Sequence, residues 1–586
     1  MPNIRMWFVM NLRAISAGTA ILLAALMSSL LRQHIESELC SLGYQKPDST
    51  SPYTDPAPIK SQDSDFAIRR YDLDLHIDPL KRRIFGRARL NVLIVAEELR
   101  SLSLNMADRL AVISVHSHNN RLHFVHRDDH LEISFERPCN ANSELEVTID
   151  YEGSPAGRGL IFDEHNSIPM IYSYGLPFTA QHWFPCKDAP ADKADSADIA
   201  ITVPASLIAA SNGRLARTTT NSDGTTTYYW EVRYPIYPDV ISVAVTNYAT
   251  FTLPYHYRQS EVMLMPFYVY PEDLEKARKQ FAVLPEMMKH HEAAFGEYPF
   301  LKEKYGVAEF AKPSFREHQT LPSFAAKLIT GDHENDWILA HELAHQWFGN
   351  CVSVKAWSHI WLNEGFANYA YALWKEKTEG DEAYRDLMQS WDKDEFPGSV
   401  FITDPTNKDA LFSETTFQKG AWILHMLRHV MGDQTFFDAL KSYVKTYAYR
   451  SADTEDFEAV CESKVGRSLN WFFKEWVYGI NRPAYECTWR TQRTGDDTVV
   501  TVEIIQGQTN SQIFEMPIDI SIVTDKGRAK FIAWQKLRSQ TFEFRVPGQA
   551  EGVELDPDGW ILKKLKQPNQ VRSGAENLCP TISTNP

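Results

Sequence analysis

The sequence predicts a multidomain α+β protein in which two β-rich domains flank a helical one. Apolar and polar residues alternate in residues 71–77, and similar runs recur between turn residues up to Thr250, as expected for strands with one buried face. From about Glu272 to Trp476 the apolar residues instead recur at helical spacing, apart from a short strand-like stretch at residues 305–310. The predicted domains are residues 66–260 (N-terminal β domain), 261–482 (helical domain) and 483–566 (C-terminal β domain).

The N-terminus predicts export from the cytoplasm. Arg5 and Arg13 precede an uncharged apolar run of eighteen residues, 14–31, which is long for the core of a signal peptide and just long enough to span a bilayer. Residues 1–40 are therefore either an uncleaved signal anchor or a cleaved signal peptide, and the lack of a small-x-small cleavage site favours the anchor. We expect the rest of the chain to lie outside the cytoplasm, membrane-anchored, or secreted or periplasmic after cleavage.

The length and composition fit a large protein with several hydrophobic cores. The chain has 586 residues, of which 44% are apolar, and this is enough for three or four domains. A net charge of -16 argues against nucleic acid or anionic lipid as a partner. Two stretches are too polar for a core: residues 41–65 are predicted to be a linker and residues 567–586 a disordered tail.

The seven cysteines are scattered without CxxC pairs, which excludes a zinc ribbon and a dense disulfide framework. Cys186 and Cys351 are expected to be packed thiols. A disulfide between Cys40 and Cys579 would be possible outside the cell.

A metal site is predicted by residues 341–345, which read His-Glu-Leu-Ala-His, and by Glu364, which follows after eighteen intervening residues. Side chains four residues apart on a helix share one face, so His341 and His345 can both bind one zinc ion at the usual distance of about 2.1 Å. With Glu364 as third ligand, one coordination position stays open for water. We therefore expect one catalytic zinc ion, with Glu342 beside it.

The alternative is an amphipathic helix with surface histidines, since a His-Glu-x-x-His string also arises by chance. Its surroundings argue against this. Asn335 can cap the helix, the residues around the motif are largely apolar, and a second helical pattern covers residues 361–377. Two histidines and a glutamate buried without a partner would cost several kcal/mol, and a metal ion removes that penalty.

Four segments carry a family resemblance: residues 183–188 (Trp-Phe-Pro-Cys-Lys-Asp), 341–350, 361–369 and the Lys-Gly-Ala of 419–421. They make the chain similar to the gluzincin aminopeptidases, the zinc metallopeptidase family of aminopeptidase N and leukotriene hydrolase, over residues 66–565. The resemblance implies a saddle-like N-terminal β domain, a thermolysin-like catalytic domain and a small C-terminal β-sandwich. We also expect the large C-terminal helical domain of many relatives to be missing.

The site residues suggest a mechanism for peptide hydrolysis. Zinc polarises the scissile carbonyl and lowers the pKa of its bound water towards about 7. Glu342 then acts as general base on the zinc-bound water and passes the proton to the leaving amine. An exopeptidase also needs an anion for the substrate's ammonium group and a donor for the developing oxyanion.

The resemblance places the amine-binding loop at residues 314–318, where the family has a Gly-x-Met-Glu-Asn-like sequence. Glu317 retains the glutamate and is the predicted anchor of the substrate's amino group, although taken alone it would read as a solvated loop acid. Ser314 replaces the glycine and Arg316 the methionine, with the bulky Phe315 between them. We therefore expect an altered or narrower edge of the cleft.

Three positions depart from the family. Phe417 stands where relatives have the tyrosine that donates to the oxyanion, and the loss of one such donor typically slows an enzyme by about 10²–10³-fold. Leu176 stands where relatives have a second amine-binding Glu or Gln. Tyr371 occupies the position of an acid that supports the metal, so this support is in doubt.

Two hypotheses follow. The first is a zinc-dependent aminopeptidase, a hydrolase of low activity that removes N-terminal residues from peptides outside the cytoplasm. The alternative is a catalytically weakened zinc-binding relative that acts as a peptide-binding or scaffold protein. Because Glu342 binds no metal and would serve little purpose in a purely structural site, we favour the enzyme.

Overall fold

The structure is a computed structural model, and it describes residues 65–566, except for 156, 176, 259–260, 313, 394 and 510–511, together with residues 577–579. The chain divides into two compact units, Met1–Tyr53 and Thr54–Pro586, and all described residues belong to the second. The predicted signal anchor, the predicted linker up to residue 64 and Leu176 lie outside the described residues. Among the helices within them, none is long and apolar enough to cross a membrane.

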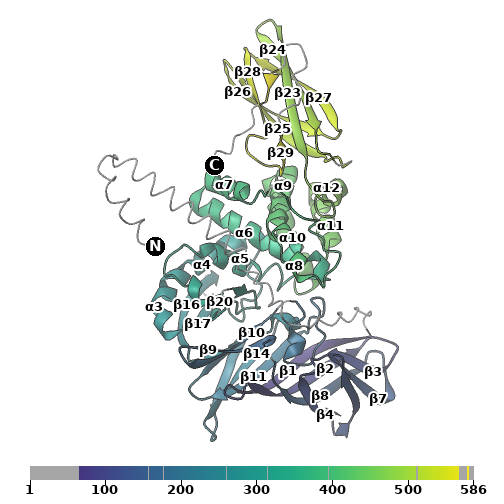
Figure 1. Ribbon diagram of the computed structural model, residues 1–586, viewed down its shortest axis with the longest axis vertical. Helices are drawn as coiled ribbons and strands as arrows, with labels where there is room; N and C mark the ends of the chain where they lie inside the picture. The colour runs from purple at the N-terminus through teal and green to yellow at the C-terminus, as the bar shows by residue number, and fades with distance from the viewer. Residues whose placement is uncertain are drawn as a thin grey trace, which may run out of the picture. The chain divides into compact units, whose positions relative to one another are not determined.

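An eight-stranded sheet forms the larger part of the N-terminal β domain (Figure 1). Its strands are β1 (Phe66–Asp78), β2 (Arg83–Ile94), β4 (Leu110–Ser117), β5 (Asn120–Arg121), β8 (Glu144–Gly153), β11 (Ser196–Pro204), β13 (Arg214–Thr220) and β14 (Thr225–Val232). They follow the order β13-β14-β11-β1-β2-β8-β4-β5, in which β1 pairs antiparallel with β2 and parallel with β11. Tyr71, Leu73 and Leu75 of β1 are fully buried, because alternate side chains of a strand share one face.

Two smaller sheets complete this domain and confirm that it is β-rich. One contains β3 (Glu98–Asn105), β7 (His130–Asn140) and β6 (His123–Arg127), in that order. The other contains β12 (Ile208–Ser211), β15 (Val243–Thr246), β10 (Ile168–Tyr174) and β9 (Gly159–His165).

A mixed five-stranded sheet connects the N-terminal domain to the helices. Its order is β16 (Ala249–Arg258), β17 (Glu261–Val269), β18 (Val307–Phe310), β20 (Ser323–Ala325) and β19 (Phe315–Arg316). The boundary that we expected at residue 260 falls inside the β16–β17 hairpin, whose strands pair antiparallel from Ala249 with Val269 to Arg258 with Glu261. The strand-like stretch expected near residue 305 is β18.

The helical domain is centred on α6, which packs against α5, α7 and α9. Its helices are α3 (Leu274–Gln280), α4 (Leu284–Phe295), α5 (Asp336–Ala344), α6 (Trp361–Glu379), α7 (Asp381–Ser390), α8 (Lys408–Leu411), α9 (Gly420–Met431), α10 (Asp433–Tyr447), α11 (Thr454–Val465) and α12 (Asn470–Trp476). A Cβ atom on Gly365 of α6 would lie 2.8 Å from the Cα atom of Gly420. The two glycines therefore let α6 and the start of α9 touch backbone to backbone.

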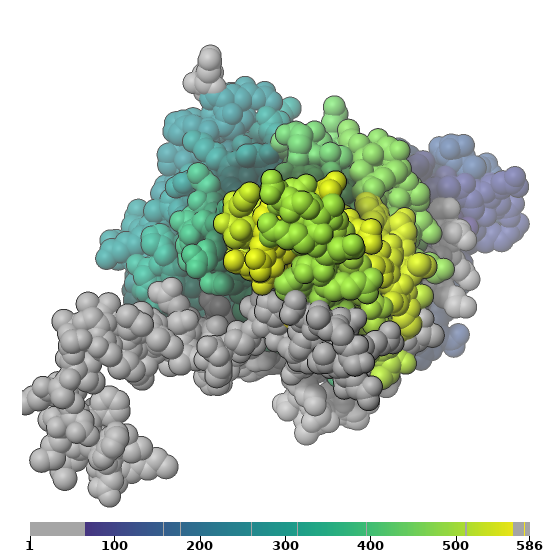
Figure 2. All heavy atoms as spheres, turned by 90° about the horizontal axis from the view of Figure 1, so that it is seen from above, coloured from purple at the N-terminus to yellow at the C-terminus, as the bar shows by residue number. Residues whose placement is uncertain are grey.

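The C-terminal β domain consists of two sheets, which Figure 2 shows as one closely packed body of green and yellow spheres. The larger sheet contains β27 (Ser539–Pro547), β24 (Asp497–Gln506), β23 (Ala484–Thr494) and β29 (Lys564–Leu565). The smaller contains β26 (Gly527–Gln535), β25 (Met516–Thr524) and β28 (Ala550–Leu555). Val502 of β24 and Ile520 of β25 are fully buried, so both sheets contribute to the core.

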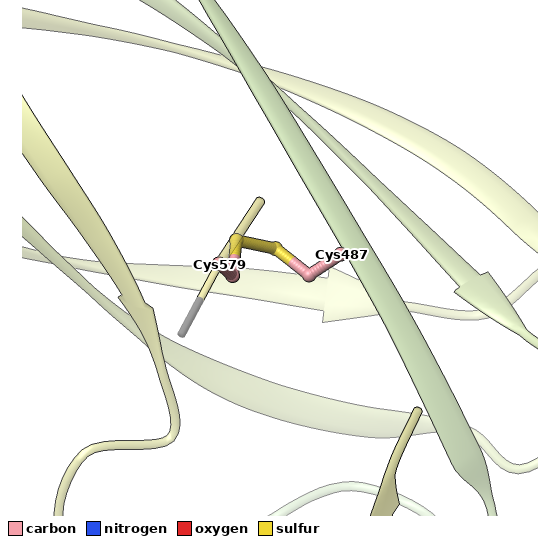
Figure 3. Close-up of a disulfide and its surroundings, with 2 residues drawn as sticks. All are labelled: Cys487 and Cys579. Carbon is pink, nitrogen blue, oxygen red and sulfur yellow. A yellow bond between two sulfur atoms is a disulfide. The ribbon is translucent and has the colours of Figure 1, made fainter. Parts of the chain in front are cut away.

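The structure corrects the disulfide considered between Cys40 and Cys579, because Cys579 is bonded to Cys487 (Figure 3). The short strand β30 (Asn577–Leu578) pairs antiparallel with β23 and brings the Cα atoms of the two cysteines to 5.5 Å, within the usual range for a disulfide. Residues 577–579 are thus part of the domain, whereas we expected all of residues 567–586 to be disordered. Cys186 and Cys351 are buried thiols, as expected.

Candidate active site

The candidate active site is built on two neighbouring helices. α5 carries His341 and Glu342, and His345 follows at its C-terminal end, where the backbone is still helical. Glu364 lies in the first turn of α6. Because α5 is buried along residues 338–344, the alternative of a surface helix with exposed histidines is wrong.

The start of α5 differs in one detail from the expectation. Asn335 directly precedes the helix, but its side chain does not cap it and instead donates a hydrogen bond to the carbonyl oxygen of Leu328 (3.0 Å). The helix start therefore depends on tertiary packing more than on a local cap.

Three potential metal ligands converge between α5 and α6. The Nε2 atoms of His341 and His345 lie 2.9 Å apart, and Glu364 Oε2 lies 3.5 Å from each of them. All three side chains are buried, with residue exposures of 1–3%. Two imidazoles and one carboxylate match the protein ligands of a catalytic zinc ion, which keeps a fourth position for water or substrate.

Hydrogen bonds on the far side of each ring orient the histidines toward this point. His341 Nδ1 lies 2.9 Å from Asn368 Oδ1, and His345 Nδ1 lies 3.1 Å from the carbonyl oxygen of Phe348. Since both partners are acceptors, each neutral ring carries its proton on Nδ1 and its lone pair on Nε2. Two lone pairs that face each other at 2.9 Å require a cation between them, so the residues present fit a metal ion.

The metal site is supported by Asn368, which was not predicted from the sequence. Tyr371, which stands where relatives have a supporting acid, packs against the rings of Trp337 and Trp391, at centroid distances of 6.2 Å and 5.9 Å. Asn368 lies four residues after Glu364 and therefore on the same face of α6, and this spacing was the available signal.

The electrostatics of the three ligands show that the site favours a positive charge. Burial by itself would raise the pKa of Glu364, but His345 and His341 outweigh it and lower this pKa to about 2. Burial would lower the pKa of His345, but the nearby carboxylates, Glu364 foremost, raise it to about 10. In the absence of a metal, a proton on His345 takes the place of the cation.

Glu342 lies next to the ligands but is not one of them. Neither oxygen of its carboxyl group has a hydrogen-bond partner in the described part of the chain, although the residue is only 1% exposed. Burial raises the pKa of Glu342 well above its ordinary value, while the charge of His345 acts in the opposite direction. A buried carboxyl group with both oxygens unpaired beside a metal site is available to exchange a proton with bound water or substrate.

Glu317 lies at the end of β19 and is buried as well, with 6% exposure. Burial raises its pKa, His345 lowers it and Glu364 raises it, so its carboxyl group belongs to the same cluster of charges. Asn350, which follows the zinc motif in the sequence, holds this loop in place. Its Nδ2 donates a hydrogen bond to the carbonyl oxygen of Glu317 (2.7 Å). The solvated loop acid considered for Glu317 is therefore wrong.

Gln346 holds the residues that follow Glu317 in the same way. Its Oε1 accepts a hydrogen bond from the backbone N–H of Thr320 (2.8 Å), and its Nε2 donates to the carbonyl oxygen of His318 (3.4 Å). The supporting roles of Gln346 and Asn350 were missed from the sequence, because a side chain that holds a distant loop leaves no local pattern.

The two bulky residues of the loop point in different directions. The Phe315 ring packs edge-on against His341, with centroids 5.7 Å apart. The Arg316 guanidinium lies over the ring of Tyr174 in β10 (3.9 Å) and donates to Ser314 Oγ (3.0 Å). Phe315 is thus the loop residue that packs against a metal ligand.

Phe417 lies in a short π-helical turn, η7 (Thr415–Lys419), that leads into α9. Its ring stacks on that of His341 at a centroid distance of 6.0 Å and an interplanar angle of 25°. The Phe417 ring therefore packs beside one of the metal ligands and offers no hydrogen-bond donor there.

Comparisons with known proteins agree with this geometry. Residues 68–236 match the peptidase M1 N-terminal domain, and residues 315–476 match the peptidase family M1 domain. Aminopeptidase M1-B of Oryza sativa subsp. japonica is 30% identical over 320 residues, which are 51% of this chain and 36% of that protein. Aminopeptidase B of Homo sapiens is 28% identical over 358 residues, which are 57% of this chain and 52% of that protein.

A solved structure shows the same architecture. The M1 zinc metallopeptidase of Deinococcus radiodurans superposes with a TM-score of 0.63 and 26% identity, over 71% of this chain and 94% of that one. The chain spans about half the length, or less, of the rice and human aminopeptidases that it matches. The two family models, the shared fold and the converging His341, His345 and Glu364 together show that the chain belongs to peptidase family M1.

Proposed function

We propose that the chain is a zinc-dependent aminopeptidase that removes N-terminal residues from peptides. The observation that carries this proposal is the burial of Glu317 beside the metal ligands. An exopeptidase needs an anion for the free ammonium group of its substrate, whereas an endopeptidase gains nothing from a buried carboxylate at this place. The aminopeptidases among the relatives support the same assignment.

In this proposal Glu317 accepts a charge-assisted hydrogen bond from the substrate's α-ammonium group and so directs the first peptide bond to the metal ligands. Zinc, when bound by His341, His345 and Glu364, supplies a Lewis acid that polarises the carbonyl and makes water a stronger acid. Glu342 takes the proton of the attacking water and donates it to the nitrogen of the leaving amine.

Phe417 favours a second candidate function. Its ring cannot stabilise the oxyanion, and without another donor the rate would fall by about 10²–10³-fold. A chain that had lost turnover in this way would be a zinc-binding relative that binds peptides or acts as a scaffold.

Mass spectrometry of a defined peptide incubated with the purified protein separates these functions. We expect stepwise loss of single residues from the N-terminus, which a chelator abolishes and added zinc restores. Glu342→Gln is the matched control, because it keeps the side-chain size and all metal ligands and should leave the peptide intact. An intact peptide with the zinc-loaded natural protein would favour the scaffold, and internal cleavage would favour an endopeptidase.

We further propose that the catalytic part acts outside the cytoplasm, either held at the membrane by residues 14–31 or released after cleavage. The apolar run behind Arg5 and Arg13 supports export. The disulfide between Cys487 and Cys579 also supports it, since disulfides persist in oxidising compartments. Cell fractionation tests the anchor: the full chain should remain with membranes after a salt wash, and a variant without residues 1–40 should not.

A further inference from the structure

A buried hydroxyl near the candidate active site has no role in the mechanism proposed above. Tyr237 directly precedes the short helix η2 (Pro238–Val240) and is 1% exposed. Its Oη atom has no hydrogen-bond partner within the part of the chain that the structure describes. Buried tyrosine hydroxyls are normally paired, because burial removes their hydrogen bonds to water. The hydroxyl of Tyr237 therefore points to a partner that is not part of these residues.

The surroundings of Tyr237 place it at the substrate side of the site. The Gln319 N–H donates to the carbonyl oxygen of Val240 (3.3 Å), which holds the turn after Tyr237 against the residue that directly follows the amine-binding loop. On its other side the Tyr237 ring packs edge-on against Trp357, with centroids 6.5 Å apart. Trp357 lies in the short helix η6 (Trp357–His359), just before α6. The contacts of Tyr237 and of its turn thus reach the segment that follows the Glu317 loop and the segment that precedes the helix carrying the third metal ligand.

Three carboxylates act on the Tyr237 hydroxyl: Glu317, Asp239 and Glu364. Burial first, and then these charges, raise the pKa of Tyr237 well above its ordinary value, so the phenol keeps its proton at neutral pH. Asp239 already accepts the backbone N–H groups of residues 178–180 at 2.9–3.1 Å. The two remaining carboxylates are the proposed amine anchor and a metal ligand, and the substrate must lie between them.

We propose that the Tyr237 hydroxyl donates a hydrogen bond to the carbonyl oxygen of the substrate's N-terminal residue and stabilises the negative charge that develops there when water attacks. This inference rests on the aminopeptidase activity proposed above. Only two carbon atoms separate the amino group of a residue from its carbonyl oxygen. A residue held between Glu317 and the metal ligands therefore places that oxygen among the same charges that act on the Tyr237 hydroxyl. Tyr237 thus supplies the donor that Phe417 lacks.

An unpaired buried phenol is not by itself a site, as Tyr485 shows. Its hydroxyl also has no hydrogen-bond partner in the described residues and is also buried, but it lies in β23 of the C-terminal β domain. The carboxylates that act on it, Asp556 and Glu475, are neither metal ligands nor part of the amine-binding loop. Tyr485→Phe removes the same atom from a similar environment and is the matched control.

The test compares Tyr237→Phe with Tyr485→Phe in the zinc-loaded full chain. If Tyr237 donates to the oxyanion, Tyr237→Phe should lower kcat by about 10²-fold with KM changed less than about twofold, because the interaction forms only in the transition state. Zinc content and Tm should stay at the natural values in both variants, and Tyr485→Phe should retain the natural kcat. A kcat within about threefold of the natural protein, or a loss confined to KM, would overturn the proposal.

A binding measurement gives a readout that does not depend on turnover. A phosphinic dipeptide analogue resembles the tetrahedral state in shape and charge, so its affinity for the zinc-loaded protein should fall by about tenfold or more in Tyr237→Phe. Unchanged affinity would contradict the role of Tyr237. If the natural protein binds zinc and the analogue but hydrolyses no peptide, the aminopeptidase proposal fails, while the change in analogue affinity still decides the role of Tyr237.

Discussion

The candidate active site has a metal side and a substrate side, and the two are built differently. The metal side consists of His341, His345 and Glu364 on α5 and α6, which pack directly against each other. The substrate side is assembled from segments that are distant in the sequence, among them the Glu317 loop and the Phe417 turn. The metal side therefore depends on local helix geometry, whereas the substrate side depends on how distant segments are brought together. The metal side has all three ligands that a catalytic zinc site needs. The substrate side departs from the family pattern at Ser314, Arg316 and Phe417.

The largest effect is expected from breaking the metal side. His345→Ala removes one of three ligands and leaves Glu364 and His341 unable to hold the ion alone, so zinc occupancy should fall to near zero and turnover to background. Metal analysis of the purified variant checks this. His333→Ala is the control, because it removes an imidazole that lies outside the ligand set. Full zinc occupancy in His345→Ala would refute the ligand assignment.

The next largest effect separates zinc binding from chemistry. Glu342→Gln should keep one zinc ion and the natural Tm but lower kcat by about 10²–10⁴-fold, because an amide cannot take the proton of water. Metal content and steady-state kinetics measured on the same sample provide the check. Turnover at the natural rate would mean that another group acts as the base.

Breaking the substrate side should cost less. Glu317→Ala should lower kcat/KM for peptides with a free N-terminus by about 10–100-fold, the usual worth of one hydrogen bond to a charged group. Glu317→Gln keeps a hydrogen-bond acceptor but not the charge, so its kcat/KM should lie between those of the natural protein and Glu317→Ala. If both variants matched the natural protein on such peptides, Glu317 would have no part in substrate binding.

Phe417→Tyr restores the tyrosine of the family and tests whether the substrate side lacks a donor to the oxyanion. Phe417→Tyr places a hydroxyl beside His341, and in the Tyr237→Phe background it should raise kcat/KM by about tenfold or more. In the natural background the gain should be smaller, since Tyr237 already donates. Kinetics of the two single variants and the double variant give this coupling directly. Strictly additive effects would show that the two hydroxyls do not serve the same oxygen.

The last prediction changes no residue and concerns the protonation of the zinc ligand His345. Without metal the pKa of His345 is raised to about 10, so at neutral pH this imidazole is protonated and zinc must displace the proton. Zinc affinity should therefore rise with pH, by about tenfold per pH unit between about pH 6 and 8. Competition with a chelator of known affinity at each pH measures this. An affinity independent of pH would show that His345 is already neutral in the metal-free protein.

The metal side could be predicted from the sequence because helix geometry is local. The spacing of His341 and His345, and the apolar surroundings that bury α5, are visible within a few turns of helix. Asn368 could have been found in the same way, since it lies one turn after Glu364. The alternating strands of both β domains are equally local features and identified the fold class.

The substrate side and the end of the chain could not be predicted in this way, because they depend on contacts between distant segments. Tyr237 becomes a candidate only when the fold places its turn against the amine-binding loop. The disulfide required the pairing of β30 with β23, which brings Cys579 opposite Cys487 across a sequence separation of 92 residues. No periodicity in a polar tail indicates which strand it will join.

Aminopeptidase activity is tested most directly by the ratio of kcat/KM for a peptide with a free N-terminus to that for its N-acetylated form, measured with the zinc-loaded protein. A metal centre combined with Glu317 as amine anchor predicts a preference for the free peptide of about 10–100-fold or more, and Glu317→Ala should narrow this ratio. Chelation should abolish both reactions. Equal cleavage of the two peptides by the natural protein would show that it is not an aminopeptidase and would contradict the role of Glu317.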